Sequence, residues 1–311
     1  MEISIIIPTY NEEKHIEKLM LSLRNQSITK EYEIILVDNG SDDKTVQIAN
    51  NLGARILHKE KNCNISAVRN LGAKKARGKY LAFIDADCEA DKDWLSNAYS
   101  ILVGNDNLGI VGGVYTPPLN KTWVQRAWYS VRVLKRMQNV NFVPGGNMFI
   151  KKILFDEVGG FNETLETGED YELCMRISEN RLIISDDRIK VIHYGDPSTL
   201  IQRLKKEIWY GKNTKDILKN KPFYLPFWLS VIYLVHLLSL LSGLVLINKT
   251  ICFYSISGIL ILIGSISFIR CLKAKVYKYY FPLLVVVMFY MLGRVISLKY
   301  IISNNKKCCK L

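Results

Sequence analysis

Several common signals are missing from this sequence, and each absence argues against a class of protein. The seven cysteines show no paired spacing of the kind that binds a structural zinc ion, so we expect reduced thiols. No Gly-x-Gly-x-x-Gly motif follows the first apolar run, which argues against a Rossmann-type dinucleotide site. No nucleic-acid-binding motif accompanies the net charge of +13, so we expect no nucleic-acid partner.

Charge is also nearly absent from three long stretches towards the carboxyl end. The first two, Phe223–Ile247 and Cys252–Ile269, contain no Asp, Glu, Lys or Arg. The third, Tyr279–Leu298, is apolar apart from Arg294. A membrane-spanning helix needs about 20 mostly apolar residues, and three such runs in succession do not fit buried helices of a soluble domain. We therefore expect about three transmembrane helices, over 223–247, 251–269 and 279–301.

The distribution of basic residues predicts how the chain is oriented in the membrane. No signal peptide precedes the first strand pattern, so we expect the amino-terminal domain to stay in the cytoplasm of a multi-pass cell-membrane protein. The positive-inside rule places the basic loop Arg270–Lys278 on the same side. A third crossing would send the basic tail 304–311 to the outside, against that rule, so whether the third stretch spans stays open.

A basic segment joins the amino-terminal part to the apolar stretches. Leu200–Leu218 is predicted to be an amphipathic helix lying on the bilayer surface, where Trp209 and Tyr210 would suit the interface. A plain solvated linker is the alternative. The expected organisation is an α/β domain over 1–199, this segment over 200–222, a membrane domain over 223–303 and the basic tail over 304–311.

Strand and helix patterns alternate from residue 3 to residue 85. Strands are predicted at Ile3–Ile7, Tyr32–Val37, Ala54–His58 and Lys79–Ile84. Asn11 is expected to cap the helix after the first strand. This alternation predicts a parallel sheet with right-handed crossovers, in which ligands bind beyond the carboxyl ends of the strands.

The order of elements becomes mixed after residue 109. Further strands are predicted at Ile110–Tyr115, Asn147–Lys151 and Arg188–His193. The fold class is therefore α/β with a mixed sheet, followed by apolar helices.

Two acids follow the fourth predicted strand. Asp85 and Asp87 are spaced i, i+2, and residues two apart in extended backbone point to the same side. Both carboxylates are therefore expected to converge on one hard cation, Mg²⁺ or Mn²⁺, which is commonly held together with substrate phosphates. An isolated Asp-x-Asp pair is also common in surface turns, so the pair gains weight only from the motifs around it.

A set of motifs, taken in order, resembles family 2 glycosyltransferases with the GT-A fold. The motifs are Ile5–Glu12, Val37–Asp43, Arg69-Asn70 with Gly72, Phe83–Asp87 and Gly168–Asp170. The resemblance covers about residues 3–195. It implies a Rossmann-like mixed sheet, a nucleotide-sugar donor and inverting transfer of a sugar, as in a hexosyltransferase.

The resemblance also implies a role for each matching residue. Asp170 would be the general base, with Glu169 as the neighbouring acid that tunes its pKa. The donor would be bound by Pro8, Thr9, Tyr10, Glu12, Asp38, Arg69, Asp85, Gly145 and Gly146. The metal ligands would be Asp85, Asp87 and His193, and the Mn²⁺ or Mg²⁺ ion would offset charge on the departing diphosphate. A UDP-sugar is favoured, because a carboxylate such as Asp38 can accept the imide N–H of uracil.

Structural alternatives exist for several of these residues. Asp38 could form a turn before Gly40, and Arg69 could be an ordinary solvated helix charge. Glu169 and Asp170 could simply be acids in the first turn of a helix. A lone histidine such as His193 is more often structural than a ligand. Gly145 and Gly146 could belong to a plain turn.

The predicted function is a membrane-anchored, inverting glycosyltransferase that acts on a lipid-linked saccharide or a polyprenyl phosphate. Processive relatives carry a Gln-x-x-Arg-Trp motif, whereas Gln202–Trp209 has a different spacing, so we expect a single transfer per encounter. A metal-dependent nucleotidyltransferase and a non-catalytic membrane scaffold that retains the fold are the alternatives.

Overall fold

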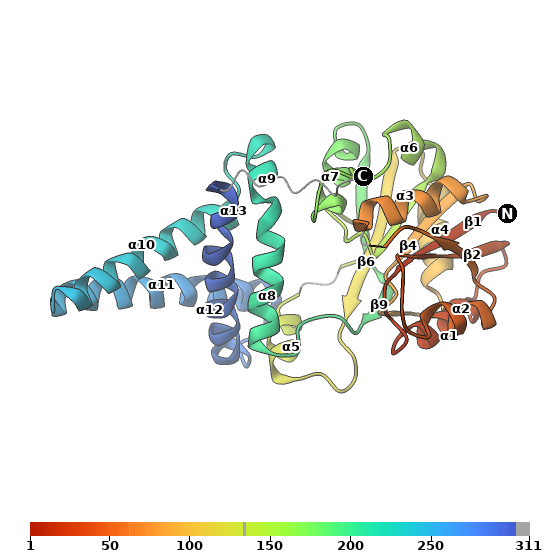
Figure 1. Ribbon diagram of the computed structural model, residues 1–311. Coiled ribbons are helices and arrows are strands. Elements are labelled where there is room, and N and C mark those ends of the chain that lie inside the picture. Colours follow the sequence, from red (N-terminus) through yellow and green to blue (C-terminus); the bar gives the residue numbers. More distant parts are fainter. Residues whose placement is uncertain (62, 133–134, 303–311) are drawn as a thin grey trace. The chain divides into compact units, whose positions relative to one another are not determined.

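The computed structural model describes residues 1–61, 63–132 and 135–302 (Figure 1). These residues form two compact units. The first contains residues 1–118 and 135–195, and the second contains residues 119–132 and 196–302. The sequence pattern placed the segment 119–132 in the α/β domain, whereas the structure groups it with the carboxyl-terminal helices.

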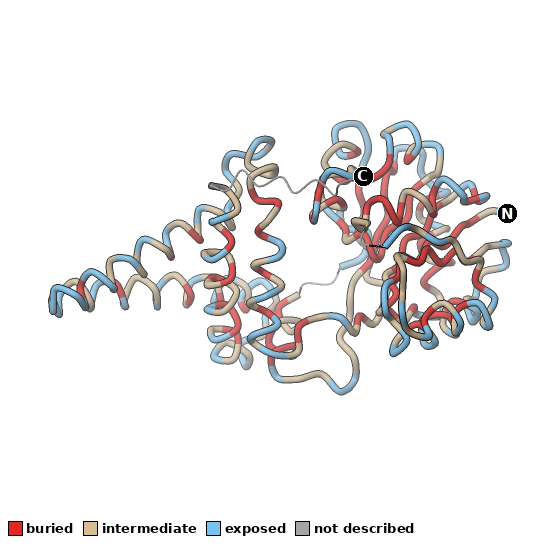
Figure 2. Tube along the Cα trace, in the orientation of Figure 1, coloured by how far each residue is buried: buried red, intermediate tan, exposed pale blue. Residues whose placement is uncertain are grey.

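The first four strands form a parallel sheet in the order β3-β2-β1-β4, as the alternating pattern predicts. The elements are β1 (Ile3–Thr9), α1 (Ile16–Arg24), β2 (Tyr32–Asp38), α2 (Thr45–Asn51), β3 (Arg55–His58), α3 (Ile65–Lys75) and β4 (Tyr80–Ile84). Every residue of β1 is buried, because helices cover both faces of the sheet and a strand in its interior must be apolar on both sides (Figure 2).

The sheet becomes mixed beyond β4, which also agrees with the prediction. β8 pairs antiparallel with β4 and β6, while β6 pairs parallel with β9. The short strand β5 lies antiparallel to the end of β9. These elements are β5 (Cys88–Ala90), α4 (Trp94–Val103), β6 (Leu108–Thr116), β7 (Gln138–Asn139), β8 (Asn147–Lys151), α6 (Lys152–Glu157), α7 (Glu169–Ser178) and β9 (Leu182–His193).

Two apolar cores hold the helices against the two faces of this sheet. One core contains side chains of α1, α2 and α4, including the fully buried Trp94. The other contains side chains of α3, α6 and α7, with Phe83, Phe155 and Phe161 packed against one another. Both cores leave the carboxyl ends of β1, β2 and β4 at one edge, which is where the candidate site is built.

The prediction that Asn11 caps the first helix is wrong. α1 begins at Ile16, and Asn11 takes a left-handed backbone conformation with φ of 55°, which Asn tolerates better than most residues. Its side-chain Oδ1 accepts a hydrogen bond from Asp42 N, and its own N–H donates to Ser41 Oγ. Asn11 therefore ties the loop after β1 to the loop after β2.

The second unit is helical. Its elements are α5 (Trp123–Ser130), α8 (Leu200–Tyr210), the 3₁₀ turn η1 (Gly211–Asn213), α9 (Thr214–Asn220), α10 (Leu225–Val245), α11 (Lys249–Ala274), α12 (Tyr280–Ser297) and α13 (Lys299–Ile302). The single helix predicted over Leu200–Leu218 is thus interrupted by η1. α8 begins with a capping box formed by Thr199 and Gln202.

Three of these helices are long and apolar enough to cross a membrane, close to the predicted ranges. They are Leu225–Val245, Lys249–Ala274 and Tyr280–Ile301. α10 and α11 form a hairpin whose turn is closed by Asn248, which accepts a hydrogen bond from Ile251 N (Figure 1). Many of their large apolar residues are exposed, as expected of helices that face lipid (Figure 2).

α12 does not follow the α10–α11 hairpin but runs beside α8 (Figure 1). A Cβ atom at Gly293 would lie 2.9 Å from the backbone carbonyl oxygen of Leu204, and one at Gly211 would collide with Ser297. Glycine at both positions lets the two helices approach closely.

Candidate active site

A buried arginine joins two distant parts of the first unit. Arg69 lies on α3 with only 4% of its surface exposed. Its Nη2 lies 2.7 Å from Asp85 Oδ1, and its Nη1 lies 2.5 Å from Glu169 Oε1. Burial lowers the pKa of Arg69, but the charges of Asp85 and Glu169 more than offset this and raise it above its usual value. Arg69 is therefore a fixed positive charge at the carboxyl end of β4.

Local features of α3 explain why Arg69 faces this site. The helix begins at Asn64, whose Oδ1 accepts a hydrogen bond from Ala67 N at 2.9 Å. Gly72, one turn after Arg69, lies so close to the sheet that a Cβ atom there would be 2.5 Å from a methyl group of Ile6. α3 therefore packs tightly on β1, and Arg69 lies on the same side of the helix. The alternative of a solvated helix charge does not apply to Arg69.

Asp170 lies beside this arginine in the first turn of α7. Its Oδ2 accepts a hydrogen bond from Gly145 N at 3.0 Å, and its Oδ1 accepts one from Tyr171 N at 2.8 Å. Burial and the neighbouring negative charge of Glu169 raise the pKa of Asp170 to about 7. A carboxyl group that titrates near neutral pH is suited to accept a proton in catalysis.

Gly145 and Gly146 bring the chain close to these charged groups. A Cβ atom at Gly145 would lie 3.0 Å from Arg69 Nη1 and 3.1 Å from Asp170 Cβ. A Cβ atom at Gly146 would collide with the carboxylate of Asp85. Close approach therefore requires glycine at position 146 and leaves little room for a side chain at position 145.

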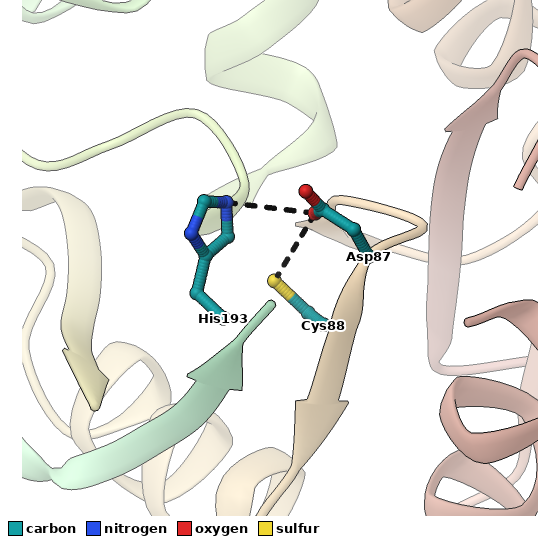
Figure 3. Close-up of side chains that lie close together, drawn as sticks. All are labelled: Asp87, Cys88 and His193. Atoms are coloured by element: carbon teal, nitrogen blue, oxygen red, sulfur yellow. Dashed lines mark hydrogen bonds and ion pairs between the residues drawn. The ribbon is translucent and has the colours of Figure 1, made fainter. Parts of the chain in front are cut away.

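A second group of potential ligands is formed by Asp87, Cys88 and His193 (Figure 3). Asp87 Oδ1 lies 3.5 Å from His193 Nε2 and 3.9 Å from Cys88 Sγ. The pairing of β5 with β9 places Cys88 opposite His193 and thereby brings the histidine to Asp87. Among residues 1–61, 63–132 and 135–302, this is the one group of three or more such side chains whose ligand atoms lie within 4.8 Å of one another.

Asp85 does not belong to this group. β4 ends at Ile84, and residues 85–87 form a turn into β5, closed by a hydrogen bond from Cys88 N to Asp85 O. The expectation that the backbone stays extended from Asp85 to Asp87 is therefore wrong. Asp85 contacts Arg69 through Oδ1 and Tyr115 Oη through Oδ2, the latter at 3.4 Å.

Tyr115 links the two groups. Burial raises the pKa of its phenol well above the usual value, so the hydroxyl stays protonated and can donate to Asp85. Its ring stacks on the imidazole of His193, with centroids 4.5 Å apart. Asp85, Tyr115, His193 and Asp87 therefore form one continuous set of contacts.

Glu12 lies next to the same acids. Burial raises its pKa to about 7, and the negative charges of Asp87 and Asp85 add to this effect. Its backbone N–H donates to Thr45 Oγ1 at 2.7 Å, which fixes the loop after β1. The site therefore contains several carboxyl groups close together, and a bound cation would reduce the repulsion between them.

The other predicted donor-binding residues lie at the ends of β1 and β2. Pro8 and Thr9 belong to β1, and the hydroxyl of Thr9 donates to Val37 O within the sheet. Tyr10 is 47% exposed. Asp38 is buried and accepts hydrogen bonds from Gly40 N and Ser41 N, which is the turn that the sequence allowed as an alternative.

Sequence patterns did not identify Cys88, Tyr115 or Tyr194 as site residues. Tyr194 N donates to Asp87 O, and its ring stacks on His15 with centroids 5.2 Å apart. Cys88 directly follows Asp87, but nothing in the local sequence indicates that its strand pairs with His193.

Comparison with known proteins agrees with this arrangement. A family model described as glycosyl transferase family 2 matches residues 4–159. The chain belongs to this family. The GT-A fold expected from its motifs is present as well.

Two curated relatives show how far the similarity extends. Glycosyltransferase AglE of Haloferax volcanii is 30% identical over 187 residues, which cover 57% of this chain and 61% of AglE. An uncharacterized glycosyltransferase of Haemophilus influenzae is 26% identical over 222 residues, which cover 67% of this chain and 85% of that protein. The match therefore spans about three fifths of the length of AglE.

Solved glycosyltransferase structures share the fold. The mannosyltransferase PcManGT from Pyrobaculum calidifontis, in complex with GDP-Man and Mn²⁺, superimposes with a TM-score of 0.62. It is 17% identical, and the match covers 96% of this chain and 87% of that one. GalNAc-T7 with UDP, GalNAc and Mn²⁺ gives a TM-score of 0.52 at 17% identity, over 69% of this chain and 51% of that one.

Proposed function

We propose that this family 2 glycosyltransferase moves a sugar from a nucleotide-sugar donor, a UDP-sugar being favoured, to an acceptor held at the membrane. The observation that carries the proposal is the pairing of Arg69 with both Asp85 and Glu169. It brings the donor-side acids after β4 next to Asp170 at the start of α7. A donor diphosphate near Asp87 and an acceptor near Asp170 would then meet at one place.

A divalent cation fits the pair Asp87 and His193. Two neighbouring ligands of an octahedral ion lie about 3 Å apart at bond lengths of about 2.1 Å, close to the observed 3.5 Å. Gly195 approaches Asp87 closely, because a Cβ atom there would collide with Asp87 Oδ2. A carboxylate with an imidazole suits Mn²⁺ better than Mg²⁺, and Mn²⁺ accompanies the nucleotides in the two solved neighbours named above.

The remaining members of the predicted metal and donor set have narrower roles in this proposal. Asp85 is held by Arg69 and would act on the donor side, beside the ion, with Glu12, Asp38 and the loop after β1 around the nucleoside. Cys88 Sγ belongs to a buried apolar core and is a soft donor, so we do not include it as a ligand. When bound, the ion would stabilise negative charge on the departing diphosphate.

Asp170 would act as the general base. At or above neutral pH its carboxylate can take the proton of an acceptor hydroxyl as that oxygen attacks the anomeric carbon. Attack from the side opposite the diphosphate inverts the configuration of that carbon. An acceptor phosphate is already ionised and would depend less on Asp170.

A membrane-associated acceptor is supported by the exposed apolar helices α10 and α11. A lipid-linked saccharide or a polyprenyl phosphate would be available at the surface of the bilayer. The basic loop between α11 and α12 favours a cytoplasmic side for that surface. A single transfer per encounter is supported by Gln202, whose side chain accepts hydrogen bonds at the start of α8 and is thereby occupied.

The test is a panel of nucleotide sugars incubated with the full-length protein, with and without Mn²⁺. We expect release of a nucleoside diphosphate that depends on the metal, and transfer to polyprenyl phosphate or a lipid-linked saccharide with an inverted anomeric centre by NMR. Pyrophosphate released from a nucleoside triphosphate would indicate a nucleotidyltransferase instead. No turnover of any donor would indicate a scaffold.

A further inference from the structure

A tryptophan of the second unit is in contact with two arginines from different helices. The guanidinium carbon of Arg203 on α8 lies 4.1 Å from the ring centroid of Trp128 on α5. The guanidinium carbon of Arg270, in the last turns of α11, lies 4.2 Å from the same centroid. Such stacking holds the guanidinium planes in place and leaves their N–H groups free to donate.

The positive charges around Trp128 outnumber the acids. Glu207 pairs with Arg203 at 2.8 Å and with Arg294 at 2.9 Å. Asp196 pairs with Lys206 at 3.0 Å and with Arg132 at 3.5 Å, and it also accepts a hydrogen bond from Tyr129. Among the described residues, no carboxylate forms an ion pair with Arg270: Glu207 attracts it from a distance, while Arg132 and Arg203 repel it. The cluster therefore carries more positive charge than its own residues neutralise.

Two donors in this cluster, Arg203 Nε and Arg294 Nε, are buried without a hydrogen-bond partner among the described residues, and only Arg294 Nε lies in an ion pair, with Glu207. Arg203 is 3% exposed and uses one Nη for Glu207, and in the part of the chain that the structure describes its Nε has no hydrogen-bond partner. An unpaired buried N–H is costly, and a second, incompletely neutralised guanidinium beside it adds to the cost. A bound anion with several acceptor oxygens would accept a hydrogen bond from the unpaired N–H and would neutralise the second guanidinium.

The position of Arg270 along α11 indicates the source of that anion. It lies in the last turns of an apolar, lipid-facing helix and is followed by Lys273, Lys275 and Lys278. A basic end on such a helix lies at the level of lipid headgroups. Exposed apolar side chains on the neighbouring elements, Trp123 on α5 and Ile201 on α8, suit the same level.

We propose that Arg270, together with Arg203 on Trp128, binds the phosphoryl group of a membrane lipid, and that this lipid is the acceptor of the glycosyltransferase. A guanidinium matches a phosphate in shape and donates two parallel hydrogen bonds to it. A phosphate monoester, with its greater charge and three terminal oxygens, would be preferred over the diester of an ordinary phospholipid. The acceptor identity rests on the proposed function, whereas the phosphoryl site itself does not.

The test measures binding of a short-chain prenyl monophosphate to the full-length protein in zwitterionic detergent, by calorimetry and without any donor. We expect Arg270→Gln to weaken binding by about tenfold or more, because a charge-assisted hydrogen bond is lost. The affinity of Arg270→Lys for the prenyl monophosphate should fall between those of the wild type and Arg270→Gln. Lys273→Gln removes the same charge from an exposed position one turn away and should change the affinity by less than about twofold. The thermal unfolding midpoint of each variant controls for folding.

Three ligands distinguish the possible sources of the phosphoryl group. The corresponding prenyl alcohol should bind at least about tenfold more weakly than the phosphate. Inorganic phosphate that binds as well as the prenyl phosphate would overturn a lipid source. Micelles doped with an anionic diester lipid that compete equally would overturn the preference for a monoester. Equal losses in Arg270→Gln and Lys273→Gln would show only general attraction and would overturn the site.

Failure of the site and failure of the proposed function give different results. If the wild-type protein transfers a sugar to prenyl phosphate and Arg270→Gln leaves the acceptor KM unchanged, the site is wrong and the function stands. If the wild-type protein binds prenyl phosphate through Arg270 but glycosylates no lipid, the site stands and the acceptor assignment is wrong.

Discussion

Arg69 and Glu169 are 100 residues apart in the sequence, yet Nη1 of the one lies 2.5 Å from Oε1 of the other. The contact is buried, with about 4% and 8% of the two side chains exposed. It connects α3, which follows a strand of the parallel half of the sheet, to α7, which precedes β9. The candidate base Asp170 is positioned by its neighbour's pairing with Arg69 as well as by its own hydrogen bonds.

Replacing Arg69 by methionine should destabilise the first unit. The change leaves the carboxylates of Glu169 and Asp85 without their partner, and breaking a buried pair from one side costs about 3–5 kcal/mol. Thermal and urea unfolding of the purified full-length protein would measure the loss. Lys74→Met, on the exposed side of the same helix, is the matched control and should change little. A loss of under about 1 kcal/mol for Arg69→Met would show that the pairing contributes little.

Asp170→Asn should abolish most of the transfer to an acceptor hydroxyl. Loss of a general base lowers the rate by about 10²–10⁴. In the wild type, the rate should rise with pH up to about 7, where Asp170 becomes ionised, and then level off. A full rate in the variant, with the same pH profile, would remove Asp170 from the base role for that acceptor.

The same residue predicts how stability depends on pH. The folded pKa of Asp170 is raised from 3.8 to about 7, so between these values the folded state holds a proton that the unfolded state has released. Its contribution to stability is therefore lost as pH rises from about 4 to about 7. Asp170→Asn should be more stable than the wild type at pH 8 and should differ less at pH 4. A variant whose advantage is greatest at pH 4 would contradict this sign.

Removal of either proposed metal ligand should weaken Mn²⁺ binding independently of any activity. We expect Asp87→Asn and His193→Gln each to reduce Mn²⁺ affinity by about tenfold or more, because one bond to the ion is lost. Electron paramagnetic resonance of free Mn²⁺ during titration measures this without a donor. Cys88→Ser is the control and should leave the Mn²⁺ affinity unchanged. If it instead weakens Mn²⁺ binding as much as Asp87→Asn, the thiol is a ligand.

The course of α12 predicts where the carboxyl end lies. α12 packs along the amphipathic helix α8 and runs across the direction of the α10–α11 hairpin (Figure 1). If α10 and α11 cross the bilayer, α12 should lie near its surface, and the basic tail then stays on the cytoplasmic side in keeping with its charge.

Reporter fusions in bacterial cells check this topology. A fluorescent protein fused after residue 311 should fluoresce, and alkaline phosphatase inserted after Asn248, in the turn of the hairpin, should be active. Active phosphatase at the carboxyl end would mean that α12 crosses the membrane as a third span.

The sequence by itself determined the strands of the parallel half-sheet and the apolar helices. Ile3–Ile7 predicted β1, and the uncharged stretch from 223 to 247 predicted α10, because burial on two faces or in lipid leaves a local pattern in the residues themselves. The motifs around Asp38, Asp87 and Asp170 likewise indicated the family, because each motif consists of only a few consecutive residues.

The tertiary structure alone decided which of these residues meet. Glu169 reaches Arg69, and His193 reaches Asp87, through the strand order β4-β8-β6-β9-β5, which no local period encodes. β4 ends at Ile84 as predicted, but the chain then turns between Asp85 and Cys88 instead of staying extended. The contact between the guanidinium of Arg270 and the ring of Trp128 likewise depends on the packing of helices that are more than 100 residues apart in the sequence. Long-range pairing depends on how whole elements fill space, and a short stretch of sequence does not contain that information.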